Sequence, residues 1–196
     1  MTDGERLQKR AFDLAGAGLG LAVLWPVIAV CWAVARRDTG ASGFFRQTRI
    51  GQFGQPFEVI KIRTMRSSDG PTITTADDPR ITPTGTFLRR WKLDELPQLW
   101  NILRGEMSFV GPRPDVPGYL DRLEGEARRV MSLRPGITGP ATLKYRDEEA
   151  LLASQADPVA FNDRTIWPDK VRINLAYLDD WSLAEDIRYI VRTLRP

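Results

Sequence analysis

A run of 22 residues without a charge, Leu14 to Ala35, restricts the possible folds of this chain more than any other feature. At a rise of 1.5 Å per residue, a continuous helix of that length is about 33 Å long, which is enough to cross the hydrocarbon core of a bilayer. The run also exceeds the core of a cleaved signal peptide, which is about 7 to 15 residues long. We therefore expect a membrane helix, and a simple span is its default interpretation.

Two features favour a helix that enters and leaves the membrane by one face. Pro26 lies in the middle of the run, where it removes a helical hydrogen bond and bends the axis. Basic pairs flank both ends, Lys9-Arg10 before and Arg36-Arg37 after, and the positive-inside rule would keep both ends in the cytoplasm. From the residues alone, a re-entrant helix broken at Pro26 and a true span are equally open.

Composition limits the chemistry of the remaining chain. With 196 residues, 42% of them hydrophobic, it can form one core but hardly two large domains. It contains no histidine, which excludes Ser-His-Asp and Cys-His catalysis and a His-ligated zinc or iron site. The only cysteine, Cys31, has no partner for an internal disulfide. Any metal site must therefore be rich in oxygen ligands, and Mg²⁺ held by carboxylates and substrate phosphates is the expected case.

The net charge of +3 favours an anionic partner without identifying it. The chain has no helix-turn-helix, zinc-finger or RNP-like signature, and its aromatic residues are not interleaved with the basic ones. We therefore expect no binding of nucleic acid.

A short helix is predicted from Asp94 to Gly105. Asp94 is a natural N-cap, Pro97 is tolerated in the first turn, and Gly105 suits a left-handed C-terminal cap. Apolar residues at helical spacing predict one buried stripe: Leu96, Leu99, Trp100 and Leu103.

Two carboxylates, Asp94 and Glu95, stand at the start of this helix. Because successive helical residues point about 100° apart, the two can only flank a common space. The partial positive charge of a helix N-terminus keeps carboxylates ionised and favours a phosphate beside them. An isolated Asp-Glu pair is usually a cap and a solvated neighbour, but cations surround this one in sequence: Arg89, Arg90, Lys92 and Arg113.

Arg113 lies in the rigid sequence Gly111-Pro112-Arg113-Pro114, where each proline fixes its own φ and restricts the residue before it. A guanidinium group held in this way is suited to grip a diphosphate with two parallel hydrogen bonds. A purely structural turn is the alternative.

Alternating residues predict a β-hairpin of two strands, Phe44 to Ile50 and Phe57 to Thr64, joined by a turn at Gly51 to Gly54. On the second strand Lys61 and Arg63 share one face, so both can project toward an anion. The alternative is a solvated basic edge that discourages aggregation.

The remaining segments predict surface structure. Residues Asp115 to Val130 and Asp169 to Asp180 have helical patterns with charged outer faces, and Ser67 to Ala76 is expected to be a loop. Ser182 to Glu185 forms a capping box before a last amphipathic helix, which either lies on anionic lipid or packs on the core.

The order of these motifs resembles the bacterial monotopic phosphoglycosyl transferases, especially the small PglC-type enzymes. The matching segments are Lys9 to Leu14, Phe44 to Gly51, Phe57 with Lys61 to Met65, Asp78 to Thr82, Leu93 to Leu99, Met107-Ser108 with Val110 to Pro114, and Pro135 to Gly139. The resemblance implies transfer of a phosphosugar from a UDP-sugar to a polyprenol phosphate. Asp94 would be the nucleophile, Glu95 its neighbour and metal partner or base, and Mg²⁺ would bind to both. Lys61, Arg89 and Arg113 would bind the substrate phosphates.

The resemblance also implies the architecture and the place of the protein. We expect a small α+β domain, mostly helical, with a re-entrant membrane helix over residues 1–37 and a catalytic domain over 38–196 on the cytoplasmic face of the bacterial inner membrane. Downstream glycosyltransferases or a second copy are possible partners, and a catalytically inert scaffold of a glycan-assembly complex is the alternative. The sequence departs from the family pattern at the bend, where it has Trp25-Pro26 in place of Ser-Pro. It also departs in the run Pro140 to Arg146, so the identity of the sugar is left undetermined.

Overall fold

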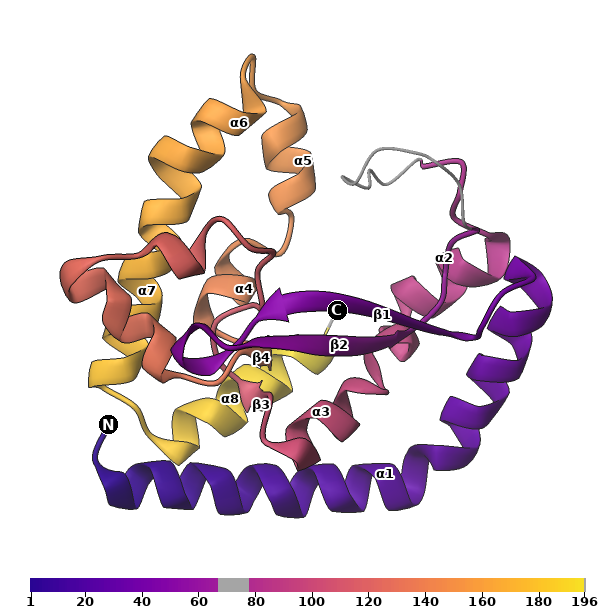
Figure 1. Ribbon diagram of the computed structural model, residues 1–196, viewed down its shortest axis with the longest axis horizontal. Coiled ribbons are helices and arrows are strands. Elements are labelled where there is room, and N and C mark those ends of the chain that lie inside the picture. The colour runs from indigo at the N-terminus through magenta and orange to yellow at the C-terminus, as the bar shows by residue number, and fades with distance from the viewer. Residues whose placement is uncertain (67–77, 196) are drawn as a thin grey trace.

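The computed structural model describes residues 1–66 and 78–195, and it is an α+β fold made mainly of helices (Figure 1). The predicted loop Ser67 to Ala76 therefore lies outside the described residues. The helices are α1 Asp3–Thr39, α2 Pro83–Arg90, α3 Gln98–Arg104, α4 Pro140–Lys144, α5 Glu148–Ala153, α6 Pro158–Phe161, α7 Trp167–Asp179 and α8 Leu183–Leu194. The strands are β1 Phe44–Ile50, β2 Pro56–Ile62, β3 Ser108–Val110 and β4 Gly136–Thr138.

Helix α1 forms the lower edge of the molecule and then bends upward beside α2 (Figure 1). It contains Pro26, which cannot donate the helical hydrogen bond and whose ring crowds the preceding turn, so we attribute the bend to this residue. The helix is bent but continuous. Its most apolar 18-residue window has a mean hydropathy of 2.1, and only 17% of that window is buried. By length and composition α1 could cross a membrane.

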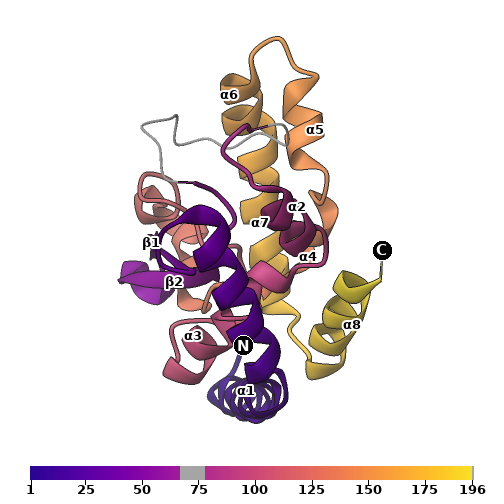
Figure 2. The ribbon, with the colours of Figure 1, turned by 90° about the vertical axis from the view of Figure 1, so that its right-hand side faces the viewer.

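Both arms of α1 pack against the rest of the chain. Ala17 belongs to a core with Val59 of β2 and Ile102 of α3, whereas Cys31 belongs to a second core with Ile62 and Leu88. Seen from the side, α1 is the base on which α3 and α8 lie at opposite flanks (Figure 2).

Polar contacts fasten the N-terminal arm of α1 to the fold. Lys9 is buried in an ion pair with Asp186 of α8, with Nζ and Oδ2 2.6 Å apart, and Tyr177 and Trp181 also donate to that carboxylate. Arg10 donates to the carbonyl oxygens at the C-terminus of α3, where helical carbonyls lack intrahelical partners. Lys9 and Arg10 are thus structural contacts as well as basic flanks of the apolar run.

The predicted hairpin is confirmed, with β1 and β2 antiparallel and Phe45 opposite Lys61. Asn101 of α3, which is fully buried, attaches the hairpin to the helix: its amide accepts from the Ile60 N–H at 3.1 Å and donates to the Glu58 carbonyl at 2.7 Å. This contact fixes the second strand against the segment that carries Asp94.

The predicted start of the central helix is wrong. Leu93–Glu95 is a separate 3-10 turn, α3 begins only at Gln98, and Asp94 does not cap it. With Asp94 as the N-cap, Pro97 would be the third helical residue, and it has no N–H to donate to the capping carboxylate. Lys92, directly before the turn, is left-handed and leads the chain into the 3-10 turn instead. Trp100 was expected in the buried stripe but is 51% exposed. The left-handed C-terminal cap at Gly105, with φ of 80°, is confirmed.

The C-terminal half corrects one helix and adds a pair of strands. Residues Asp115 to Val130 form only 3-10 turns and loops, whereas the helix predicted from Asp169 is confirmed as part of α7. The Ser182 hydroxyl accepts from the Glu185 N–H and caps α8, which confirms one half of the predicted capping box. The Glu185 carboxylate pairs with Arg188 and not with the Ser182 N–H. Strands β3 and β4 pair in parallel and hold the Arg113 loop beside the end of the hairpin.

Candidate functional site

The candidate site forms where the 3-10 turn Leu93–Glu95 meets β2 and α2. Lys92, which precedes the turn, adopts a left-handed conformation with φ of 56° and ψ of 20°. This conformation is unfavourable for a residue with a side chain, so the surrounding structure must enforce it. It redirects the chain after α2 and brings Asp94 toward the fold, where that residue is only 8% exposed.

Asp94 is a carboxylate without a partner. Within residues 1–66 and 78–195, no group donates a hydrogen bond or an ion pair to it. Burial and the negative charge of Glu95 raise its pKa, while the charges of Lys61, Arg89 and Lys92 act in the opposite direction. The side chain is therefore held in a site where its charge is partly compensated by cations, while its oxygen atoms accept no hydrogen bond from the described residues.

Glu95 behaves differently although it is adjacent. Its Oε1 lies 3.0 Å from the Lys61 Nζ, so Glu95 forms an ion pair with a residue of β2. Burial would raise the pKa of Glu95, but the charges of Lys61, Arg113 and Lys92 outweigh this and lower it. Glu95 therefore stays ionised beside Asp94.

Two predicted phosphate-binding arginines lie on different elements. Arg89, near the end of α2, donates through Nε to the Thr64 hydroxyl at 2.9 Å, which orients its guanidinium group. Arg113 is exposed and has no ion pair or hydrogen bond with any side chain in the described part of the molecule.

Backbone hydrogen bonds hold the loop that carries Arg113 in place. The Gly111 N–H donates to the Thr138 carbonyl at 2.9 Å, and the Gly136 N–H donates to the Pro112 carbonyl at 2.8 Å. A Cβ on Gly111 would lie 2.2 Å from the Arg134 carbonyl oxygen, so glycine is required there. Arg113 thus has a rigid base and a free guanidinium group.

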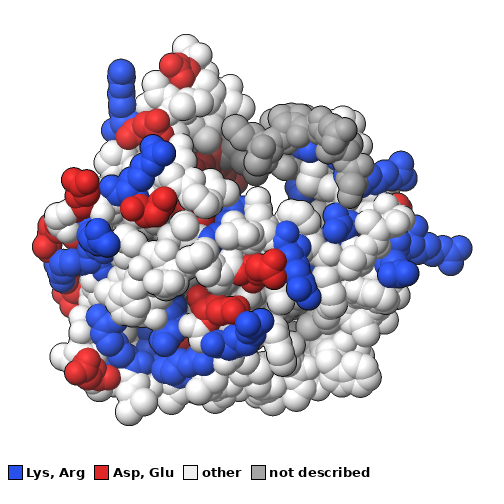
Figure 3. Space-filling model, viewed as in Figure 1, with Lys and Arg blue, Asp and Glu red and all other residues white. Residues whose placement is uncertain are grey.

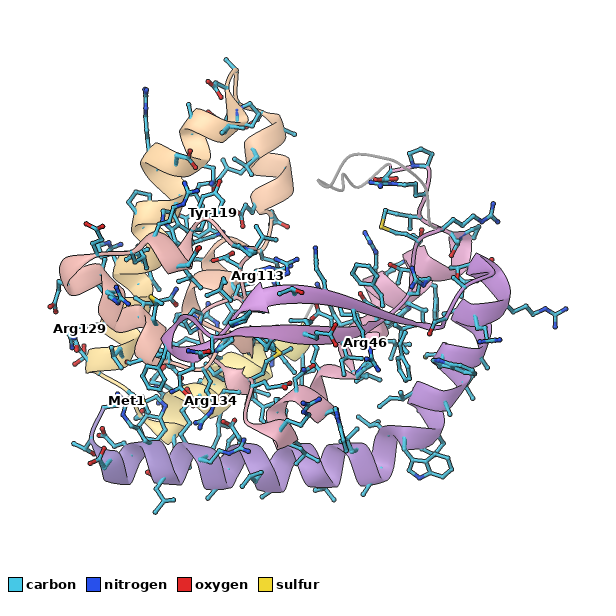
Figure 4. The ribbon with its side chains drawn as sticks, in the orientation of Figure 1. Met1, Arg46, Arg113, Tyr119, Arg129 and Arg134 are labelled. Carbon is cyan, nitrogen blue, oxygen red and sulfur yellow. The ribbon has the colours of Figure 1, made fainter. Side chains whose placement is uncertain are left out.

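Lys61, Glu95 and Arg113 line one cavity, with about 410 Å³ of empty space that is partly open to solvent. We refer to it as the Lys61 cavity. Figure 4 shows Arg113 beyond the end of β1, between the hairpin and the lobe made by α5 to α7. In the space-filling view the surface is hollowed in that region, and both basic and acidic side chains border the hollow (Figure 3).

The structure therefore brings together most of the residues expected at the site. Asp94 and Arg89 do not line the cavity. Asp94 is linked to the lining by charge, because Lys61 and Glu95 both act on its pKa, as does Arg89. Arg63 does not contribute, since it donates to the carbonyls of Ser42 and Phe44 and lies over the Phe45 ring. Pro26 lies in α1, away from the cavity lining.

Sequence reasoning missed three polar lining residues, Gln47, Arg49 and Gln98. Arg49 is positioned by donation to Gln47 and to the Pro114 carbonyl, and burial beside Arg113 lowers its pKa. Its place in the motif Phe44 to Gly51, two residues from Gln47 on one strand face, was the available signal. Gln98 lies in the motif Leu93 to Leu99, which was the available signal for it.

Two carboxylates could contribute to a metal site. In residues 1–66 and 78–195 no group of three acidic, cysteine or histidine side chains gathers around one point. Mg²⁺ is commonly bound by one or two carboxylates together with water and substrate phosphates. The unpartnered Asp94 and the adjacent Glu95 fit that mode.

Comparison with known proteins gives consistent matches over nearly the whole chain. The model of the family described as bacterial sugar transferase matches residues 4–196. The sugar transferase EpsL of Bacillus subtilis is 35% identical over 190 residues, which cover 95% of this chain and 85% of the relative.

Two further relatives have names that state a reaction. The UDP-glucose:undecaprenyl-phosphate glucose-1-phosphate transferase of Caulobacter vibrioides is 34% identical over 195 residues, 96% of this chain and 68% of the relative. The Escherichia coli protein of the same name is 36% identical over 197 residues, and the match covers 96% of this chain but 40% of that longer relative. The chain belongs to the bacterial sugar transferase family, the phosphoglycosyl transferases that its motifs resemble.

Proposed function

We propose that this protein transfers a sugar 1-phosphate from a UDP-sugar to a polyprenol phosphate and releases UMP. The observation that carries the proposal is the buried Asp94, which has no partner among the described residues, beside the Glu95–Lys61 ion pair and the cations of the Lys61 cavity. The names of the Caulobacter and Escherichia relatives support this reaction class. The product would begin the assembly of a surface glycan such as an exopolysaccharide.

In the first step an Asp94 oxygen attacks the sugar-linked phosphorus of the donor. A bond forms between that oxygen and phosphorus, the bond from phosphorus to the bridging oxygen breaks, and UMP leaves with the electron pair. Arg113 and Lys61 offset the charge of the diphosphate, because phosphoryl transfer depends mainly on alignment and electrostatic stabilisation. Arg89, held by Thr64, supplies positive charge on the side of Asp94.

In the second step an oxygen of the polyprenol phosphate attacks the same phosphorus. The bond from phosphorus to Asp94 breaks, the carboxylate is regenerated, and the lipid diphosphosugar is the product. Glu95 stays ionised throughout because the nearby cations lower its pKa.

Asp94 and Glu95 would hold a Mg²⁺ ion together with oxygen atoms of the diphosphate. When bound, the ion would neutralise negative charge on the phosphates, which is the chemistry that Mg²⁺ supplies in phosphoryl transfer.

The membrane arrangement is part of the proposal. The exposed side of α1 is apolar, including Leu19, Val23 and Trp25, each 63 to 69% exposed. Figure 3 shows the lower right edge, along α1, without charged side chains. Because both arms of α1 pack on one folded domain, a helix that enters and leaves by the same face fits better than a span. The domain would then lie on the cytoplasmic face of the inner membrane, where a lipid phosphate can reach Asp94.

The test uses purified full-length protein with single UDP-sugars, polyprenol phosphate and Mg²⁺. UMP should form with at least one UDP-sugar, and Asp94→Asn should abolish its formation. If no UDP-sugar yields UMP, the inert scaffold becomes the better account. Asp94→Asn with unchanged UMP formation would refute the role of Asp94.

A further inference from the structure

A second cavity lies behind the Arg113 loop, with about 490 Å³ of empty space that is partly open to solvent. Helices α4 and α7 form its walls, and Arg113 lines both this cavity and the Lys61 cavity. We name it the Asn174 cavity after the residue that characterises it. In Figure 4 the labelled Arg113 lies below Tyr119, between the hairpin and the lobe of α5 to α7.

Two polar atoms in the lining are buried without a hydrogen-bond partner in the described part of the chain: Oδ1 of Asn174 and Oγ1 of Thr142. Asn174 is only 6% exposed. Buried polar groups in native proteins are nearly always hydrogen-bonded, so two unpartnered atoms on the α4 and α7 walls of one cavity indicate a missing partner. The partner must offer a hydrogen-bond donor to the Asn174 oxygen and a second polar atom to the Thr142 hydroxyl.

The charged groups around the cavity are largely paired with one another. Lys170 donates to both oxygens of Glu148, at 2.6 and 2.7 Å, and the Tyr145 hydroxyl donates to Asp169 at 2.8 Å. Two further charged residues line the cavity, Arg113 and Asp115, and burial raises the pKa of the Asp115 carboxyl group to about 6. For a ligand the lining therefore offers this carboxyl group, the Arg113 guanidinium group, a neutral polar pair and two aromatic side chains, Tyr145 and Trp167. This lining suits an uncharged, flat, polar ring better than a second phosphate.

We propose that the Asn174 cavity binds the uracil base of the donor, an inference that rests on the proposed function. Uracil has an N–H group flanked by two carbonyl oxygens on one edge. The N–H can donate to Asn174 Oδ1, and a carbonyl can accept from the Thr142 hydroxyl. Tyr145 and Trp167 supply apolar ring surface beside the base.

The order of groups in the donor selects the base rather than the sugar. The sugar-linked phosphorus must lie at Asp94, and the second phosphate follows toward Arg113. The ribose and base then continue past Arg113 into the Asn174 cavity, which Arg113 also lines. The sugar extends from the other side of the reacting phosphorus, where Asp94 and Arg89 lie.

The experiment measures UMP binding to the full chain without turnover. Thr142→Val and Asn174→Ala should each weaken UMP binding by about tenfold, the effect expected from loss of one hydrogen bond in a buried site. Binding of inorganic pyrophosphate, which should occupy only the Lys61 cavity, should be unchanged. Asn162→Ala, which removes an amide outside the cavity lining, is the matched control and should bind UMP normally.

Folding is checked by thermal melting, and only variants that melt as the parent does are compared. Unchanged UMP affinity in both variants would overturn the proposal. So would a change in preference among UDP-sugars with unchanged UMP affinity, because it would assign the cavity to the sugar.

The same binding measurement in an Asp94→Asn host separates this proposal from the proposed function. If that host still transfers phosphosugar, the mechanism fails while the uracil site is judged by UMP affinity alone. If the host is inactive and Asn174→Ala binds UMP normally, only the uracil site fails.

Discussion

Asp94 experiences two opposing influences, since burial and Glu95 disfavour its negative charge while Lys61, Arg89 and Lys92 favour it. The net result is a raised pKa for a carboxylate that the mechanism requires in its ionised form. Activity should therefore be lost as the pH falls through this raised pKa, at higher pH than for an ordinary aspartate.

Substitution of the neighbouring charges should move this acid limb in opposite directions. Glu95→Gln removes a repelling charge, so the pKa of Asp94 should fall and the acid limb of kcat/KM should move to lower pH. Arg89→Met removes an attracting charge and should move the limb to higher pH. Measurement of the residual kcat/KM of each variant as a function of pH tests both predictions. Shifts of the acid limb in the same direction in the two variants would contradict this electrostatic account.

Arg113 is expected to act through the shape of its side chain as well as its charge. Arg113→Lys keeps the charge but loses the planar fork, so KM for the UDP-sugar should rise by about tenfold. Arg122→Lys, at an exposed position outside both cavities, is the control and should leave KM unchanged. Equal kinetics in the two variants would favour a purely structural role for the Arg113 loop.

At the level of elements, α1 and α8 are joined by a buried ion pair. The side chains of Lys9 and Asp186 are 8% and 1% exposed, and Tyr177 and Trp181 share the carboxylate. Breaking a buried pair leaves an uncompensated charge, which is far more costly than loss of an exposed pair.

Lys9→Met should therefore lower the free energy of unfolding by about 3–5 kcal/mol. The matched control is Arg46→Met, which breaks the exposed pair with Glu58 and should cost less than about 1 kcal/mol. Denaturant unfolding in detergent measures both, and a similar loss in the two variants would mean that the Lys9 pair does not hold α1 to the fold.

The elements that the sequence predicted correctly depend on local signals. The hairpin follows from alternating residues around Gly51 to Gly54. The C-terminus of α3 follows from Gly105, and the N-terminus of α8 follows from Ser182. The start of α3 was missed because the left-handed Lys92 is imposed by its surroundings and has no sequence signature.

Features built from distant segments could not be predicted. Strands β3 and β4 have three residues each and pair across a separation of more than twenty residues, so no local period reveals them. The Asn174 cavity combines residues from the Arg113 loop, α4 and α7 in the same way. The candidate site residues Asp94, Glu95 and Arg113 could be proposed from the sequence because each lies in a short motif with unusual chemistry.

At the scale of the whole molecule, both arms of α1 pack on one domain, so we predict that the two ends of α1 lie on the same side of the membrane. In a Cys31→Ser background, Gln8→Cys and Ser42→Cys place single thiols at exposed positions beside the two ends of α1. A membrane-impermeant maleimide should label both thiols in inverted vesicles and neither in intact spheroplasts. Labelling of the two positions from opposite sides would establish a span and contradict the re-entrant arrangement.

The central claim is that Asp94 carries the phosphosugar during the reaction. Incubation with a donor labelled at the sugar-linked phosphorus, without polyprenol phosphate, followed by acid quenching and peptide mapping, tests it most directly. The account predicts label on the peptide that contains Asp94, its absence in Asp94→Asn, and its discharge when polyprenol phosphate is added. Label on another residue, or transfer to lipid with no labelled protein at any time, would contradict it.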